Sequence, residues 1–123
     1  MPNTLFKAKR VSDEKWVQGD LIRYENGTFI SNFIGETYQY QINLDTICQY
    51  IGKKDINGKK IFKGDIVIPN YVTPFGDMTN EIDEYRKGVV IYDAQRCQFL
   101  IQQFMDDRKN YISQVTVIGN IHD

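Results

Sequence analysis

Catalytic chemistry in this chain would have to come from its carboxylates. Asp20 and Asp65 each follow a glycine at the start of an apolar run, and two carboxylates can act as general acid and base. Gly-Asp steps are more often turn residues whose side chain bonds the neighbouring backbone. We therefore expect no enzyme, and a hydrolase that uses Asp20 and Asp65 is the least favoured of three functional hypotheses.

Nucleophilic and metal chemistry lack the residues they need. The single histidine, His122, is the penultimate residue and a poor base for a Ser/His/Asp or Cys/His arrangement. Two isolated cysteines, Cys48 and Cys97, do not give the paired spacing of a zinc site. The stretch 55–58 is similar to the start of a calcium loop, but Ile66 stands where the bidentate glutamate belongs. No glycine-rich phosphate-binding motif occurs, so we expect no metal and no cofactor.

A group of lysines between residues 53 and 63 offers a second hypothesis, nucleic-acid binding. Only Asp55 supplies a counter-charge there, and lysines with a nearby aromatic ring can follow a phosphate backbone and stack on bases. The alternative, that the lysines protect an edge hairpin from pairing with other chains, is favoured because the segment has no arginine. The nucleic-acid candidates are Lys53, Lys54, Lys59, Lys60, Phe62 and Lys63.

An acidic segment offers the leading hypothesis, a non-catalytic module that binds a protein. Residues 70–85 break the strand pattern with Pro74, Gly76 and several carboxylates, so they predict a long exposed loop. The loop could contact a basic protein partner, or it could be a solvated insertion without a partner. It could also contact the lysine hairpin, either within one chain or between the subunits of a homo-oligomer. The protein-binding candidates are Tyr71, Phe75, Asp77, Glu81, Asp83, Glu84 and Tyr85.

The elements that must position these residues are short β-strands. Alternation of apolar and polar residues predicts strands over 5–11, 16–24, 28–32 and 36–42. Asn26-Gly27 and Asn57-Gly58 predict tight hairpin turns, because Asn and Gly accept the positive φ that such turns require. Residues 43–46 predict a turn or a single helical turn.

The second half of the chain continues in the same way. Strands are predicted over 48–51, 64–68, 88–92, 97–104 and 115–118. Pro69 is expected to mark a strand end or an edge, because proline has no N–H to donate. One short helix is expected within 79–87, capped by Thr79 or Asn80. Strands bracketed by Gly and Asp favour a small, strongly bent barrel of the SH3-like kind.

These patterns together predict an all-β protein with at most one short helix. An N-terminal β module, residues 1–50, is expected to pack on a C-terminal SH3-like barrel or roll, residues 51–123. The net charge of −1 gives no general attraction to nucleic acid or membrane. No apolar run approaches the ~18 residues of a membrane span, and no secretory signal occurs. We expect a cytoplasmic protein in which Cys48 and Cys97 are buried free thiols.

Three blocks of sequence resemble the YopX family, small proteins encoded by phages and prophages of mostly Gram-positive bacteria. They are FKAKRVSDEKWVQGDLI (6–22), QYIGKKDINGKKIFKGDIV (49–67) and VIGNIHD (117–123). The middle block is the most specific, because it combines Tyr, Gly, Asp, Lys and apolar positions at fixed spacing. The resemblance implies a β-rich fold that ends in a small SH3-like roll. As separate expectations, the protein works in the cytoplasm of the bacterial host and binds a host or phage protein. It implies no known activity and no catalytic residue.

Overall fold

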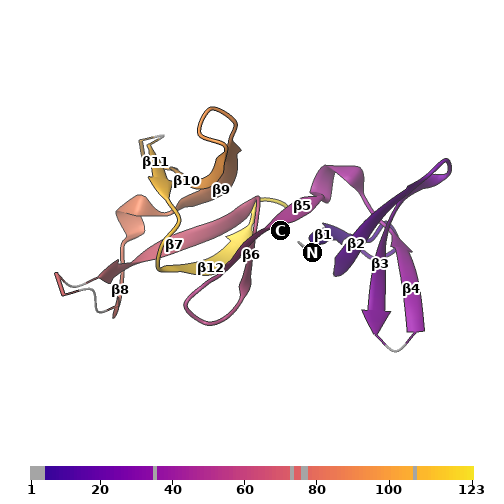
Figure 1. Cartoon of the computed structure of the whole chain (residues 1–123), viewed down its shortest axis with the longest axis horizontal. Helices are drawn as coiled ribbons and strands as arrows, with labels where there is room; N and C mark the ends of the chain where they lie inside the picture. Colours follow the sequence, from indigo (N-terminus) through magenta and orange to yellow (C-terminus); the bar gives the residue numbers. More distant parts are fainter. Residues whose placement is uncertain (1–4, 35, 73, 76–77, 107) are drawn as a thin grey trace. The chain divides into compact units, whose positions relative to one another are not determined.

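The computed structural model describes residues 5–34, 36–72, 74–75, 78–106 and 108–123 (Figure 1). This part of the chain is all-β: antiparallel strands joined by turns, with two 3-10 helices of three residues each. The predicted all-β class is therefore confirmed, although at most one short helix was expected. The chain divides into two compact units, Met1–Tyr50 and Ile51–Asp123.

The first unit is an antiparallel sheet. Its strands follow the order β4-β3-β2-β1-β5, and a 3-10 helix, η1, precedes β5. The elements are β1 (Phe6–Lys9), β2 (Trp16–Tyr24), β3 (Gly27–Ile34), β4 (Glu36–Gln41), η1 (Leu44–Thr46) and β5 (Cys48–Lys54), whose last residues enter the second unit.

Local sequence explains the turns of this unit. The predicted hairpin is present, but Tyr24 pairs with Gly27, so the turn residues are Glu25 and Asn26 and not Asn26 and Gly27. Gly27, with φ 146°, is already the first residue of β3. The Asn43 side chain accepts a hydrogen bond from the backbone N–H of Asp45 at 3.1 Å and caps η1. One face of the sheet buries Ala8, Ile30 and Ile42, with Phe6, Val17, Leu21 and Ile47 packed against them.

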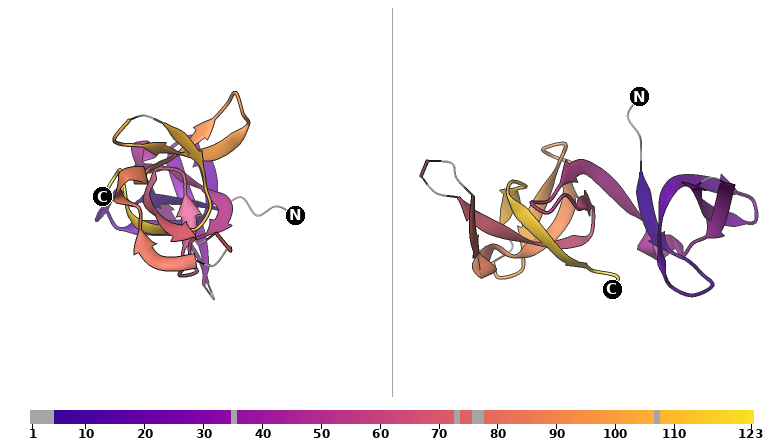
Figure 2. Two further views of the ribbon diagram at one scale, coloured as in Figure 1. Left: turned by 90° about the vertical axis from the view of Figure 1, so that its left-hand side faces the viewer. Right: turned by 90° about the horizontal axis from the view of Figure 1, so that it is seen from below.

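The second unit contains the remaining strands and the second 3-10 helix. Its elements are β6 (Lys60–Phe62), β7 (Asp65–Val72), β8 (Met78–Ile82), η2 (Glu84–Arg86), β9 (Gly88–Asp93), β10 (Gln98–Gln103), β11 (Lys109–Tyr111) and β12 (Val115–Asn120). The sheet order is β11-β10-β9-β7-β12, and β8 pairs with β7 as a hairpin. The strands curl strongly (Figure 2), but no sheet of the described residues closes into a barrel.

A contiguous apolar core holds the second unit together. It contains Ile61, Val67, Val90, Ile101, Ile112, Val115 and Val117, and the half-buried Ile51 and Phe99 pack against it. The core side chains come from β6, β7, β9, β10 and β12 and from the link after β11, because alternate residues of each strand face inward.

Two buried carboxylates fix the turns on either side of β6. Asp55 accepts hydrogen bonds from the backbone N–H groups of Asn57 at 2.9 Å and Lys59 at 2.8 Å. Asp65 accepts one from the N–H of Phe62 at 2.8 Å and one from the side-chain amide of Asn120 at 2.9 Å. The Gly-Asp step at 64–65 is thus a structural turn.

The segment 70–85 is not the long loop that its composition predicts. β7 continues to Val72, β8 occupies Met78–Ile82, and the 3-10 helix η2 follows, so the segment is largely a β-hairpin. The expected helix within 79–87 is reduced to η2, and its N-cap is Asp83 instead of Thr79 or Asn80. Pairing of β8 with β7 satisfies backbone groups that a loop would leave to water.

Pro69 does not end its strand. It lies inside β7, opposite Val115 of β12. On its other side β9 pairs only with Ile66 and Val67, and β8 pairs from Asn70 onward. The missing N–H therefore falls where neither neighbour needs it, while the Pro69 carbonyl accepts a hydrogen bond from Asp83 N at 2.8 Å.

The two cysteines have different environments. Cys48 is 2% exposed, as predicted. Cys97 is exposed, which corrects the prediction, because it ends the turn between β9 and β10 with a left-handed φ of 53°. Strand β10 begins only at the next residue, Gln98. In the described part of the chain, no helix has the length and hydrophobicity needed to cross a membrane.

Candidate functional site

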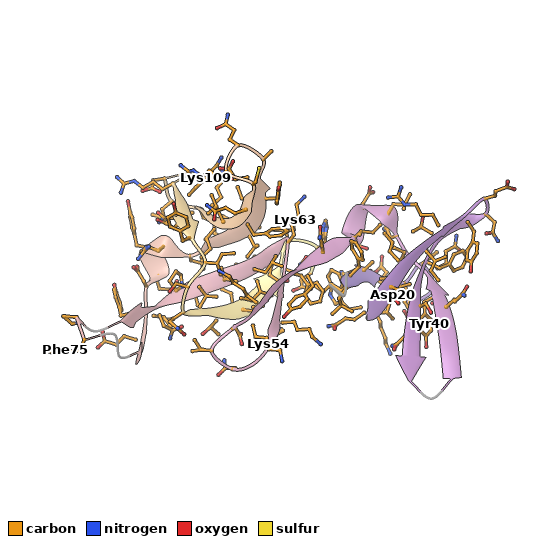
Figure 3. The ribbon with its side chains drawn as sticks, in the orientation of Figure 1. Asp20, Tyr40, Lys54, Lys63, Phe75 and Lys109 are labelled. Atoms are coloured by element: carbon orange, nitrogen blue, oxygen red, sulfur yellow. The ribbon has the colours of Figure 1, made fainter. Side chains whose placement is uncertain are left out.

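The lysines of the β5–β6 hairpin do not form a patch with an exposed aromatic ring. Phe62 is only 1% exposed, so it is not available to stack on a base. Lys53 donates from Nζ to the backbone carbonyl of Ile112 at 3.3 Å. All five lysines of the segment are exposed: Lys53, Lys54, Lys59, Lys60 and Lys63. Figure 3 shows Lys54 near the hairpin turn and Lys63 at the opposite end of β6.

Large apolar side chains gather instead around η2 and the turn between β10 and β11. These segments lie side by side at one end of the second unit (Figures 1 and 2). The Tyr85 hydroxyl donates to the Asp106 carboxylate at 3.2 Å, and the N–H of Phe104 donates to the carbonyl of Lys87 at 3.1 Å. These two hydrogen bonds hold η2 against the turn.

A groove of about 380 Å³ lies between η2 and that turn. Tyr85, Phe104 and Met105 supply its apolar lining and are 56%, 51% and 69% exposed. Glu84 and Lys87 complete the lining, and their side chains pair at 3.8 Å. The groove therefore presents apolar surface with its charges already paired.

A second hollow, a pocket of about 240 Å³, lies on the other side of η2. Residues of β7, η2 and β11 line it, among them Pro69, Tyr71, Arg86 and Tyr111. Tyr71 and Tyr111 are 47% and 72% exposed, and the buried Ile101 and Val115 contribute to the lining. We call Tyr71, Tyr85, Phe104, Met105 and Tyr111 the aromatic rim, since they border the groove and this pocket.

The structure brings some of the predicted protein-binding residues to this surface. Tyr71, Asp83, Glu84 and Tyr85 line one of the two hollows. Asp83 is 9% exposed and lies 4.0 Å from the guanidinium of Arg86, so its charge is compensated within η2.

The other predicted protein-binding residues lie apart from the two hollows or outside the residues that the structure describes. Phe75, at the outer end of the β7–β8 hairpin, is 92% exposed (Figure 3). Glu81 is exposed on β8. Asp77 lies outside the described residues.

Sequence reasoning missed Phe104, Met105 and Tyr111. Phe104 was assigned to the strand 97–104, whereas β10 ends at Gln103 and the aromatic ring falls in the turn. Strand β11 was not predicted at all, because it is only three residues long. The only signal in the sequence for this exposed surface was a run of apolar residues that continues past the end of a strand into a turn.

The two carboxylates considered for a hydrolase, Asp20 and Asp65, belong to different units of the chain. Asp65 is fully buried, and its two oxygens accept hydrogen bonds from Phe62 and Asn120. Asp20 is exposed on β2 of the first unit (Figure 3). Among the described residues, no three His, Cys, Asp or Glu side chains are grouped so that they could hold a metal ion.

The pKa of Asp93 is lowered, and the cause is structural. Its burial works in the opposite direction, but the backbone N–H of Arg96, the charge of Lys109 and the N–H of Gln95 stabilise the carboxylate. The N–H groups of Gln95 and Arg96 lie 2.9 and 3.2 Å from Oδ1 and form the turn after β9. The same carboxylate draws Lys109 of β11 to 3.4 Å.

The fold and this surface define a class: a two-unit all-β protein whose second unit carries an exposed aromatic rim. The chain belongs to the YopX protein family, whose model matches residues 5–123. The family resemblance drawn from the three sequence blocks is thereby confirmed. A search of curated proteins found no match to the chain.

Proposed function

We propose that this chain is a non-catalytic protein-binding module, an accessory protein of a phage or prophage that works in the bacterial cytoplasm. The observation that carries the proposal is the aromatic rim: each of its side chains is 47% to 72% exposed. Soluble proteins seldom leave grouped apolar side chains in water unless a partner covers them. Aromatic residues and Met are also enriched in the cores of protein interfaces.

The strand order supports an SH3-like roll as the architecture of the second unit. In such a roll the last strand pairs with the first, and the remaining strands follow in a meander. The order β12-β7-β9-β10-β11 has this arrangement, with β12 as the last strand and β7 as the first. Strand β8, which pairs with β7, is inserted in the sequence between β7 and β9. Small barrels of this kind host many functions, so the argument for protein binding rests on the aromatic rim alone.

A photochemical crosslinking experiment tests the proposal. Tyr85, Tyr111 or Tyr92 is replaced by p-benzoylphenylalanine, and host cells that make the full chain are irradiated. Tyr92 is the matched control, because it is 46% exposed on β9 and lines neither hollow. We expect discrete protein adducts at positions 85 and 111 and none at 92. Adducts at no position, or equally at all three, would refute the aromatic rim as a binding surface.

Nucleic-acid binding by the lysine hairpin is a weaker proposal. Five exposed lysines support it, but the aromatic ring meant to stack on bases is buried. Without a stacking platform, only the phosphate contacts of the lysines remain.

A further inference from the structure

Strand β11 is an edge of the sheet in the second unit. Among the described residues it pairs only with β10, and Asn110 lies opposite Ile101. The backbone N–H of Gln103 donates to the carbonyl of Arg108 at 2.8 Å, so these two residues form a hydrogen-bonded pair. Hydrogen-bonded and non-hydrogen-bonded pairs alternate along an antiparallel ladder. The backbone groups of Asn110 therefore face β10, and those of Lys109 and Tyr111 face away from it. This outer edge is able to accept another strand.

The edge lacks the protection that lysines usually give to exposed strands. A lysine on an edge normally hinders pairing because its charge would be covered. Here the Nζ of Lys109 lies 3.4 Å from Asp93 Oδ2, which Arg96 also approaches at 3.8 Å, so the charge of Lys109 is partly compensated on the β9 side. Tyr111, 72% exposed, is the other outward-facing position and offers an aromatic surface instead of a charge.

The 240 Å³ pocket lies beside this edge. It is lined by β11 and by Val115 of β12, the two end strands of the sheet order, together with residues of β7. The pocket thus lies at the seam across which the curled sheet does not close. Tyr71 from β7 and Tyr111 from β11 both line it.

The polar groups at the seam include unused hydrogen-bonding capacity. Asn110 lines the pocket, and its Nδ2 is buried without a hydrogen-bond partner among the described residues. The Oε1 of Gln103, on the same face of the adjacent strand but outside the pocket lining, is also buried without a partner among the described residues. The Asn110 Nδ2 is therefore the free donor at the pocket, and it complements the C=O of a peptide group. Asp83 and Arg86 compensate each other at 4.0 Å, so the pocket favours a neutral occupant.

We propose that β11 and the seam pocket bind a neutral, extended peptide segment of the partner protein, which adds to the sheet as a further strand. The inference rests on the proposed protein-binding function and specifies how the partner is held. Backbone hydrogen bonds to Lys109 and Tyr111 supply the affinity. Apolar side chains at alternate positions of the peptide enter the pocket between Tyr71 and Tyr111 and supply the specificity.

The test selects short peptides from a random library displayed against the full chain. Selected peptides are measured on Tyr111→Ala, which removes the ring, and on Tyr111→Pro, which removes the ring and an outward N–H and leaves the ladder to β10 intact. We expect neutral sequences with alternating apolar residues, and about tenfold or more weaker binding to Tyr111→Pro than to Tyr111→Ala. Peptide binding should slow hydrogen exchange at the N–H groups of Lys109 and Tyr111.

A second measurement does not depend on the folding of any variant. The selected peptide is N-methylated at alternate residues, which blocks strand pairing from one side only. One of the two methylated series should lose binding about tenfold or more, and the other should retain it. Proline-rich selected peptides, equal tolerance of both methylated series, or exchange protection confined to other residues would refute strand addition. Those results leave protein binding itself intact. Selection of no peptide also counts against strand addition, while the crosslinking result decides independently whether the aromatic rim binds protein.

Discussion

The carboxylate of Asp55 accepts a hydrogen bond at 3.0 Å from the backbone N–H of Val117, 62 residues later in the chain. The other oxygen of the same carboxylate accepts from Asn57 and Lys59. One side chain thus shapes the turn between β5 and β6 and ties that turn to the last strand. Close by, the N–H of Ile56 donates to the carbonyl of Val115 at 3.0 Å. These bonds cover part of the outer edge of β12, which makes β11 the more accessible edge.

Replacement of this carboxylate should destabilise the second unit. In Asp55→Asn an amide N–H would face a backbone N–H, and at least one buried donor would lose its acceptor. We expect a loss of about 1–3 kcal/mol in the free energy of unfolding, measured in urea. Asp45→Asn, at an exposed position of η1, serves as the control and should change little. Equal stability of the two variants would contradict the role given to Asp55.

The residue types that the turn tolerates at position 58 should depend on backbone conformation alone. Gly58 has φ +80°, and a Cβ there would have no atom within 4 Å. Gly58→Val should lower stability by about 1–2 kcal/mol, because a β-branched residue resists positive φ. Gly58→Asn should cost clearly less, since asparagine tolerates this region. Thermal unfolding of both variants checks the prediction. A Val variant as stable as the Asn variant would show that residue 58 does not have a positive φ.

Acid should weaken the first unit through Asp13. A hydrogen bond from the Arg10 side chain, together with the N–H of Lys15, lowers the pKa of Asp13 from 3.8 to about 2. A carboxyl whose pKa is lower in the folded state stabilises the fold above its unfolded pKa. The contribution is therefore complete above about pH 4 and is lost as the pH falls toward 2.

The variant Asp13→Asn should remove this part of the pH dependence. Its stability relative to the unmodified chain should be lower at pH 7, and the difference should shrink as the pH falls toward 2. Urea unfolding at several pH values gives both curves, and Glu25→Gln, in the exposed turn after β2, is the control. A difference that stays constant with pH would show that the Arg10–Asp13 pair does not contribute.

The lysine hairpin should not bind nucleic acid tightly. Fluorescence anisotropy with single-stranded DNA, duplex DNA and RNA at several salt concentrations should show weak binding, because the exposed lysines have no exposed ring among them. Submicromolar binding that releases about three to five ions, and that is lost when Lys54, Lys59, Lys60 and Lys63 become Glu, would establish the nucleic-acid alternative instead.

The two thiols should differ in their accessibility to reagents. Cys97 is exposed in the β9–β10 turn, whereas Cys48 is 2% exposed. In the native protein a thiol reagent should therefore modify one cysteine rapidly, and Cys97→Ser should abolish that fast phase. Cys48 should react only as the first unit opens. Fast modification that persists in Cys97→Ser would show that Cys48 is the accessible thiol and would contradict this prediction.

Local patterns in the sequence determined most strands and turns. Trp16–Tyr24 forms β2 over the predicted residues, and the 3-10 turn after Asn43 lies where a helical turn was expected. The turn at Asn57-Gly58 follows from the positive φ that glycine accepts. These features depend on alternation and turn chemistry within a few residues, which a single sequence displays directly.

Tertiary structure alone decided the hairpin in 70–85, the position of Pro69 inside β7 and the exposure of Cys97. Each depends on which neighbouring strand pairs at that residue, and strand pairing is a long-range choice. The aromatic rim has the same origin. Tyr71 and Tyr111 are far apart in sequence and line one pocket, while Tyr85 lines the groove on the other side of η2. Curvature and register, which no local pattern encodes, therefore create the surface on which the proposed function rests.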